Sequence, residues 1–287
     1  FLLTGDLGYN CFEAFKKEFP NRFINIGVAE NNMMGIGIGL ALSGKEVYIY
    51  SIIPFLIYRS LEHIRNYITS HNLNIKLIGA GGGFSYGPLG LSHNPVEDIN
   101  IIKTLPNISI FNPGTKIEAN LCINEMFKIK GSAYIRLGKT FEGEITDKEN
   151  KYKIGNGIRI KKGNDIILIT TGNIIENILK VSENLEKKGF KLGIISFPCL
   201  KPLNKKFILN NIKLNTKIIF IEENVETGSL KDSIRNILYE NNIKINFLGS
   251  ILLKDKTHNQ IGDQKYLRLI NGLSIDKIEK EIIKLMK

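Results

Sequence analysis

Residues 24–44 read INIGVAENNMMGIGIGLALSG, a short apolar strand that runs through Glu30 into a predicted helix over residues 31–43. Three glycines stand inside this helix: Gly35, Gly37 and Gly39. Each glycine costs a helix interior roughly 1 kcal/mol relative to alanine, so close packing of the helix backbone has to compensate. Apolar residues occur on every side of the helix, which indicates that it is buried, at the centre of the fold or at a subunit interface.

Strand and helix patterns alternate on both sides of this segment. In the first half of the chain we predict strands at 22–27, 46–51, 75–80, 108–111 and 133–137, and helices near 11–19, 31–43, 56–71, 96–103 and 116–129. The pattern restarts with strands at 165–172, 191–197 and 217–223. Three further helices are predicted: one that ends near 188, one that begins at 229 and one that closes the chain from 275. This alternation is typical of mainly parallel sheets covered by helices, so we predict an α/β fold. The apolar periodicity lapses between 141 and 162, which predicts two α/β domains, 1–150 and 151–287.

Composition excludes several classes of protein. A chain of 287 residues with 43% hydrophobic residues is large enough for roughly two packed domains. The net charge of +11 comes from Lys and Arg spread along the whole chain, so we expect a basic solvated surface and no nucleic-acid partner. The longest apolar run, 33–42, is shorter than the 18 or so residues that span a membrane.

Three cysteines, odd in number and far apart, cannot build a disulfide framework or a metal clamp within one chain, which favours a reducing cytoplasmic location. Because the sequence opens at Phe1 in a strand-like run, we expect some native N-terminal sequence to precede it.

Glu30 stands where the strand gives way to the apolar helix. It can be an ordinary acidic residue in a first helical turn, where the helix dipole favours negative charge. It can equally be a buried carboxyl that stays protonated, so that it donates to a ring nitrogen or moves a proton. The residue type alone leaves both interpretations open.

A glycine-rich loop follows the strand at 75–80 and reads GGGFSYGPLGLSHNPVED from Gly81 to Asp98. It does not match the dinucleotide fingerprint, because Phe84 stands where the third glycine belongs. Loops after parallel strands often carry active sites, and His93 is the titratable base of this loop. His93 is either a solvated histidine or a catalytic one.

Aromatic residues cluster in the run YIYSIIPFLIYRS, which contains Tyr48, Tyr50, Phe55 and Tyr58. Such rings are most often core residues. A ring at the end of the strand can instead form a stacking wall for a planar ligand.

Together these segments resemble the C-terminal half of transketolase, in the form in which the enzyme is split into two subunits. The resemblance rests on an ordered set of motifs: TGDLG with Asp6, GVAENNMMGIGIGLALSG with Glu30, the run with Phe55, GPLGLSHNPVED with His93, AYIRLGK with Arg136, and IILITTGNIIENILKVSENLEKKGFKLGIISFPCLKPLN and IGDQKYLRLINGLSIDKIEKEI in the second half. It covers nearly the whole chain.

The resemblance implies that the first domain holds the aminopyrimidine ring of thiamine diphosphate. Glu30 would then donate a hydrogen bond to a ring nitrogen, Phe55 would stack on the ring with Tyr58 as the alternative, and Asp6 would lie beside the cofactor. His93 would act near the substrate oxygens, and Arg136 would bind the phosphate of an acceptor. The cofactor would carry a two-carbon ketol unit from a ketose donor to an aldose acceptor.

The resemblance also implies a missing half. The family holds the diphosphate and Mg²⁺ with a GDG motif and a later Asn, and this sequence contains no GDG. We therefore expect an N-terminal partner subunit that carries the diphosphate and Mg²⁺ site, no metal ligands on this chain, and a heterotetramer in which this chain also pairs with itself. The second domain resembles the family's C-terminal domain, which builds the dimer interface.

Two positions depart from the family pattern and put the substrate in question. Leu89 replaces an acidic residue that reads donor hydroxyls, and Gly81 stands where a phosphate-contacting His is common. A sugar phosphate and a modified or nucleotide-linked sugar are both candidate substrates. The alternatives are the β subunit of a 2-oxo-acid dehydrogenase E1 component, a 1-deoxyxylulose-phosphate synthase-like enzyme, and a non-catalytic structural subunit.

Overall fold

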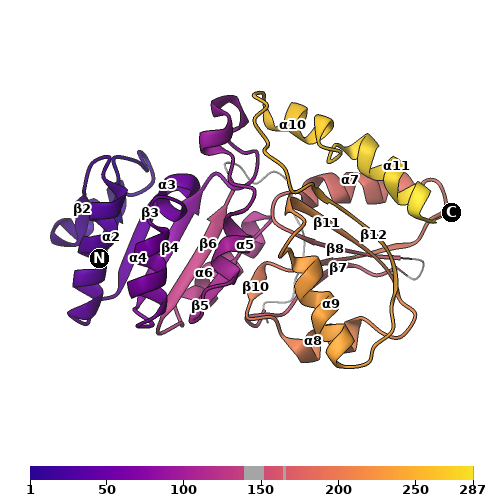
Figure 1. The fold of residues 1–287 in the computed structure, drawn as a ribbon, viewed down its shortest axis with the longest axis horizontal. Helices are drawn as coiled ribbons and strands as arrows, with labels where there is room; N and C mark the ends of the chain where they lie inside the picture. Colours follow the sequence, from indigo (N-terminus) through magenta and orange to yellow (C-terminus); the bar gives the residue numbers. More distant parts are fainter. Residues whose placement is uncertain (139–151, 164–165, 287) are drawn as a thin grey trace.

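A seven-stranded sheet occupies the first lobe of the computed structural model, which describes residues 1–138, 152–163 and 166–286 (Figure 1). Its strand order is β10-β5-β6-β4-β3-β1-β2. The strands are β1 (Leu2–Thr4), β2 (Phe23–Asn25), β3 (Val47–Ile52), β4 (Ile75–Ala80), β5 (Ile108–Phe111), β6 (Ser132–Leu137) and β10 (Cys199–Lys201). All neighbouring pairs are parallel except β10 and β5.

The helices of this lobe connect its parallel strands, which cannot be joined by tight hairpins. They are α1 (Glu13–Glu18), α2 (Glu30–Leu42), α3 (Ile53–Ile57), α4 (Leu61–His63), α5 (Asp98–Lys103) and α6 (Lys116–Met126). The expected helix over 56–71 is divided into α3, α4 and a wider turn of helix at Ile64–Thr69. Ser60, whose hydroxyl donates to Asn31 Oδ1 at 3.2 Å, marks the break between α3 and α4.

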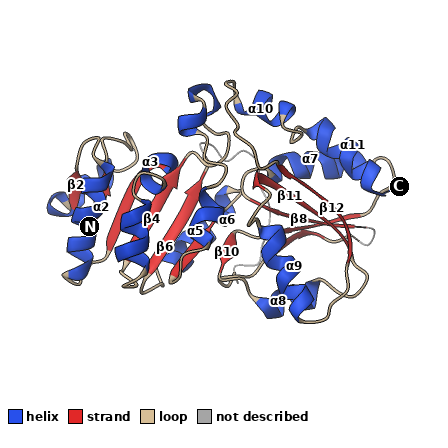
Figure 2. Cartoon of the chain, in the orientation of Figure 1, coloured by secondary structure: helices blue, strands red, loops and turns tan. Residues whose placement is uncertain are grey.

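A five-stranded sheet with the order β12-β11-β8-β9-β7 forms the second lobe. Its strands are β7 (Ile158–Lys161), β8 (Ile166–Thr171), β9 (Leu192–Ser196), β11 (Lys217–Val225) and β12 (Asn246–Leu253), and β7 is antiparallel to β9. The helices α7 (Ile175–Glu186) and α11 (Ile275–Met286) lie along one side of this sheet and α8 (Lys205–Asn211) and α9 (Leu230–Glu240) along the other (Figure 1). The short α10 (Gln264–Ile270) lies between α11 and the first lobe (Figure 2).

The predicted α/β class with mainly parallel sheets is confirmed. The structure adds strands β7, β10 and β12, which the sequence patterns did not indicate. β10 is notable because it follows β9 of the second lobe yet extends the sheet of the first lobe. The expected domain boundary at 150/151 lies outside the described residues.

Helix α2 is buried on one side only in this chain, so it does not lie at the centre of the fold, and the expected alternative of a subunit interface stays a prediction. Met33, Met34 and Gly37 pack against the sheet, and a Cβ at Gly37 would stand 2.7 Å from Ile49 Cδ1. The opposite side carries Gly35 and Gly39, both exposed and with nothing within 4 Å of an added Cβ, and Leu42 at 64% exposure. The glycine pattern reflects close packing at one position and an open surface at the other two.

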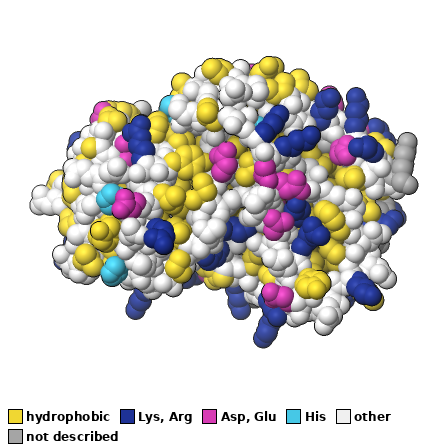
Figure 3. All heavy atoms as spheres, in the orientation of Figure 1, with side chains coloured by type: hydrophobic (Ala, Val, Ile, Leu, Met, Phe, Trp, Pro, Cys, Tyr) yellow, Lys and Arg dark blue, Asp and Glu magenta, His cyan; other side chains and the backbone are white. Residues whose placement is uncertain are grey.

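On the face of the molecule that Figure 3 shows, Lys and Arg side chains are spread over both lobes rather than gathered in one basic patch. Within the described residues, no helix combines the length and apolarity needed to cross a membrane.

Candidate functional site

The candidate residues gather where the parallel strands of the first sheet end. Asp6 follows β1, Glu30 follows β2, Phe55 lies in α3 directly after β3, the loop with Gly81 follows β4, and Arg136 lies near the end of β6. Ligands of α/β proteins bind outside the carboxyl ends of the strands. The order of strands in the sheet, rather than their order in the sequence, makes these residues neighbours.

Glu30 is the first residue of α2 and is 3% exposed. Its Oε2 accepts a hydrogen bond from Arg59 Nη1 at 2.9 Å, and the Arg59 side chain is 52% exposed. The positive end of the helix dipole lies at the same place and favours a negative charge there. Glu30 therefore points into the protein and not into solvent, and it has a cationic partner from the turn between α3 and α4.

Phe55 and His93 are brought together by the fold although they are far apart in sequence. The Arg59 guanidinium lies over the Phe55 ring at 4.4 Å from its centroid, and the His93 ring meets Phe55 edge-on at 5.0 Å. Glu30, Arg59, Phe55 and His93 thus form a continuous series of contacts, which we call the Glu30–His93 row. Tyr58 lies to the side of this row, because its hydroxyl donates to Glu97 Oε2 at 3.0 Å and burial raises its pKa.

The glycine loop is built so that its backbone can approach other groups closely. Gly81 has a φ of 89°, and a Cβ there would stand 2.2 Å from the Tyr86 ring. The N–H groups of Gly81 and Gly82 both donate to the carbonyl of Leu137, at 2.8 and 3.0 Å. Leu89 lies further along in a 3₁₀ turn and is 55% exposed. Tyr86 therefore fills the space that any side chain at position 81 would need.

Arg136 lies beneath this loop and not on an open surface, because only 4% of it is exposed. Its Nη2 donates to the Pro95 carbonyl at 2.7 Å, and its Nε stands 3.3 Å from Asp98 Oδ1. Asp98 also accepts from the Tyr134 hydroxyl at 2.5 Å. Burial raises the pKa of the Asp98 carboxyl while the Arg136 guanidinium opposes that rise.

Asp6 is exposed and has its own local contacts. Its Oδ1 accepts from Tyr9 Oη at 3.0 Å and from Asn25 Nδ2 at 3.2 Å. The structure thus unites Glu30, Phe55 and His93, places Gly81 at the start of the loop that carries His93 and Arg136 beneath that loop, and leaves Asp6, Tyr58 and Leu89 at the margins.

Sequence reasoning missed Arg59, Tyr86 and Asp98. The signal for Arg59 was its position four residues after Phe55, which puts both side chains on one side of a helical turn. Asp98 gave no signal in the sequence, since its partner Arg136 is on a distant strand.

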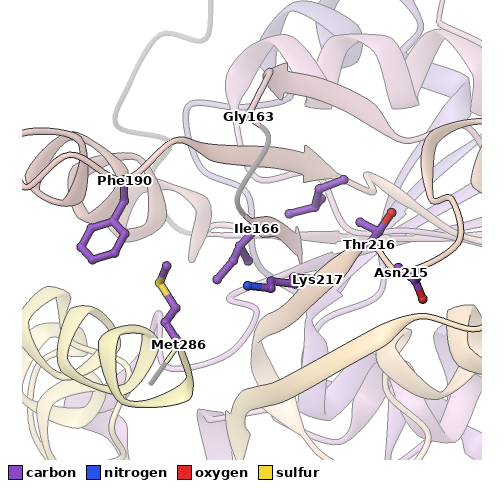
Figure 4. Close-up of a pocket in the computed structure, with 8 residues that line it drawn as sticks. Gly163, Ile166, Phe190, Asn215, Thr216, Lys217 and Met286 are labelled. Carbon is purple, nitrogen blue, oxygen red and sulfur yellow. The ribbon is translucent and has the colours of Figure 1, made fainter.

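A metal site does not form from this chain's described residues: nowhere among them do three or more His, Cys, Asp or Glu side chains gather closely enough to hold an ion. A pocket in the second lobe is lined by Ile166 and Lys217, the first residues of β8 and β11, together with Phe190 and Met286 (Figure 4). It lies at the amino ends of its strands, so it is separate from the Glu30–His93 row.

Comparison with known proteins gives the row its context. Residues 1–141 match the family model of the transketolase pyrimidine binding domain, and residues 155–254 match the model of the transketolase C-terminal domain. The chain is 31% identical to a subunit of the apulose-4-phosphate transketolase of Actinobacillus succinogenes over 92% of this chain and 85% of that protein. It is 26% identical to the subunit of the same name from Phocaeicola vulgatus over 82% of this chain and 76% of that protein.

Among solved structures, a split-gene transketolase described as an inactive β4 tetramer superposes with a TM-score of 0.84 at 26% identity, over 99% of this chain and 91% of the other. The expected resemblance to one subunit of a split transketolase is confirmed by these matches. Both domain models match in the expected order, and the chain covers 85% of the 31% identical relative from Actinobacillus succinogenes. The chain therefore belongs to the transketolase family.

Proposed function

We propose that this chain is the C-terminal subunit of a two-subunit transketolase and supplies the pyrimidine-binding half of a shared thiamine diphosphate site. The observation that carries the proposal is the Glu30–His93 row, in which a buried carboxyl, a planar ring and an imidazole meet at the carboxyl ends of parallel strands. Residues 1–150 would form the pyrimidine-binding domain and residues 151–287 the C-terminal domain.

The residues of the row suit an aminopyrimidine ring. Glu30 offers a carboxyl group, shielded from water, that can hold a proton against a ring nitrogen, and Phe55 offers a ring face for stacking. Arg59 covers that face at 4.4 Å, and since it is half exposed it can turn away towards solvent when a ring binds. In this proposal Tyr58 and Asp6 frame the cofactor from the two margins.

When bound, thiamine diphosphate supplies the carbanion chemistry that carries a two-carbon ketol unit. His93, on the loop over Phe55, holds or moves a proton at a substrate oxygen. Binding of an acceptor phosphate by Arg136 stays a prediction, and in the structure its guanidinium holds Pro95 and Asp98.

A partner subunit completes the proposal, because the sequence contains no GDG motif of the kind that holds the diphosphate and Mg²⁺ in the family. That partner would bring the diphosphate and Mg²⁺ ligands to Glu30, in a heterotetramer with two shared sites in the cytoplasm. The exposed side of α2, with Gly35 and Gly39, would be a contact surface, since its backbone is open to close approach. The inactive β4 tetramer of a relative supports a chain that needs a partner for activity.

The substrate is a sugar or sugar phosphate, and relatives named for apulose 4-phosphate support an unusual one. Leu89 and Gly81 are the residues expected to set this choice. Leu89 exposes an apolar side chain, so the loop offers no anion at position 89. Tyr86 fills the volume beside Gly81, so the loop offers no side chain at position 81.

The test is reconstitution with the partner subunit. Thiamine diphosphate binding, measured by calorimetry, should require both subunits, and E30Q should lower turnover by roughly 10²-fold or more because a positioned proton-transfer group is lost. E62Q, which alters an exposed glutamate of the same lobe, is the matched control and should be unaffected. Tight cofactor binding by this chain alone, or wild-type turnover of E30Q, would contradict the proposal.

A further inference from the structure

The carboxyl end of β11, in the second lobe, holds the base of the glycine loop in the first lobe. Glu223 is 3% exposed, and its Oε1 accepts from the Phe84 N–H at 2.7 Å and from Gln264 Nε2 at 3.2 Å. Its Oε2 accepts from Arg268 Nε at 2.5 Å, inside a buried ion pair. One carboxylate of the second lobe therefore binds a backbone amide of the loop that carries His93.

The far end of the same loop is held by the same strand. The N–H of Val225 donates to the carbonyl of Val96 at 3.0 Å, and the N–H of Gly83 donates to the carbonyl of Pro95 at 3.0 Å. The two ends of the segment 84–96 therefore both lie against the carboxyl end of β11. The Glu223 side chain binds the first end, and the Val225 backbone binds the second. We call this arrangement the β11 clamp.

The loop sequence is fitted to the clamp. Gly83 has a φ of 63°, and a Cβ there would stand 2.3 Å from Glu223 Oε1. Backbone strain and lack of space both exclude a larger residue at this position. Glycine at 83 is thus favoured both by the loop's own backbone conformation and by the Glu223 carboxylate of the second lobe.

Glu222, the preceding residue of β11, performs a different task although it is equally buried. Its carboxylate accepts from the N–H groups of Leu230 and Lys231, both at 3.1 Å, and so caps α9 of its own lobe. Successive side chains of a strand point to opposite faces, which explains why two adjacent carboxylates serve two lobes.

We propose that Glu223 is a positioning residue for catalysis: through the Phe84 amide it fixes the loop 84–96 and hence the place of His93 over Phe55. This inference rests on the proposed function, since it assumes that His93 acts on the substrate. It assigns the second lobe a part in the active site beyond building an interface. Misplacing a catalytic group by about 1 Å can lower the rate roughly 10²-fold, so loss of the clamp is expected to lower turnover.

The experiment compares E223Q with E222Q in the enzyme reconstituted with its partner. E223Q keeps the side-chain volume and removes the charge that binds Phe84 N–H and Arg268. We expect faster hydrogen exchange in peptides covering 84–96 and a kcat lowered by roughly 10-fold to 10²-fold. Thiamine diphosphate affinity should stay close to the wild-type value, because neither Glu30 nor Phe55 contacts Glu223 itself. E222Q should leave both the loop exchange and kcat unchanged.

Wild-type loop exchange or wild-type kcat in E223Q would overturn the inference, as would an equal loss of kcat in E222Q. If E223Q does not fold because Arg268 is left as a buried unpaired cation, the double variant E223Q/R268M removes that cation and is judged by the same readouts. H93A separates the two proposals: wild-type kcat in H93A rejects the role of His93, and the clamp is then judged by exchange in 84–96 alone.

Discussion

Replacing Gly35 and Gly39 by alanine should stabilise this chain and at the same time weaken its assembly. Both positions lie inside α2, and a Cβ at either would meet no atom within 4 Å. Gly37 is the matched control in the same helix, because its Cβ would stand 2.7 Å from Ile49 Cδ1. The three substitutions therefore differ in surroundings and not in chemistry.

The magnitudes follow from helix propensity and packing. Each exposed Gly→Ala change should raise the free energy of unfolding by about 0.8–1 kcal/mol, or about 2 kcal/mol for G35A/G39A together. G37A should gain nothing or lose stability, since overpacking costs about 1–3 kcal/mol and offsets the propensity gain. If a partner backbone packs on Gly35 and Gly39, the added methyl groups should raise the Kd of assembly by roughly 10-fold to 100-fold.

Urea unfolding of the chain without its partner, at one low protein concentration, gives the first quantity. Titration with the partner subunit, followed by light scattering, gives the second. A gain in stability with wild-type Kd would show that the exposed side of α2 is not a subunit contact. A loss of stability in G35A/G39A would refute the packing of α2 itself.

Three further predictions concern buried charges and thiols. R136M should lower the free energy of unfolding by about 3 kcal/mol, because Asp98 is left as a buried unpaired charge. The control R65M, at an exposed site, should change the free energy of unfolding little. Equal urea midpoints for the two variants would contradict this prediction. Burial lowers the pKa of Lys76 to about 8 in the folded chain, so above that pH the unfolded chain binds more protons than the folded chain does. Between pH 8 and 9.5, wild-type stability should therefore rise relative to K76M, by at most about 1.4 kcal/mol per pH unit, and parallel curves would argue against it. Of the three cysteines Cys11 is exposed and the other two are buried, so one thiol should react with Ellman's reagent in the native chain and three in denaturant.

The sequence predicts the parts of the fold that depend on local patterns. Apart from β12, the parallel strands of both lobes and the start of α2 follow from apolar runs with the period of a strand or a helix. β10 has only three residues between Pro198 and Pro202, which is too short for an alternating pattern, and it forms because β5 offers an open edge. Residues 56–71 read as one helix, yet Ser60 and its contact with Asn31 divide it, because packing against α2 overrides the local pattern.

The candidate site divides in the same way. Glu30, Phe55 and His93 could be selected from residue type and position, since each follows a strand that the patterns reveal. The contacts that unite them could not, because Arg59 pairs with a residue on a separate helix. The part of Glu223 could not be predicted from the sequence either, because it lies in the other lobe and contacts the site only through the backbone amide of Phe84.

If the proposed partner subunit packs on α2, the position of Glu30 on this helix couples cofactor binding to assembly. Glu30 is the first residue of this helix, and Gly35 and Gly39 open its outer side within the following turns. A subunit that packs on those glycines fixes the axis of α2, and with it the carboxyl group at the amino end, because a helix transmits such a shift along its hydrogen-bonded backbone. In the chain alone the same carboxyl is paired with Arg59, whose guanidinium covers Phe55. Under the proposed function, assembly and the release of Arg59 from Glu30 and Phe55 are therefore expected to occur together.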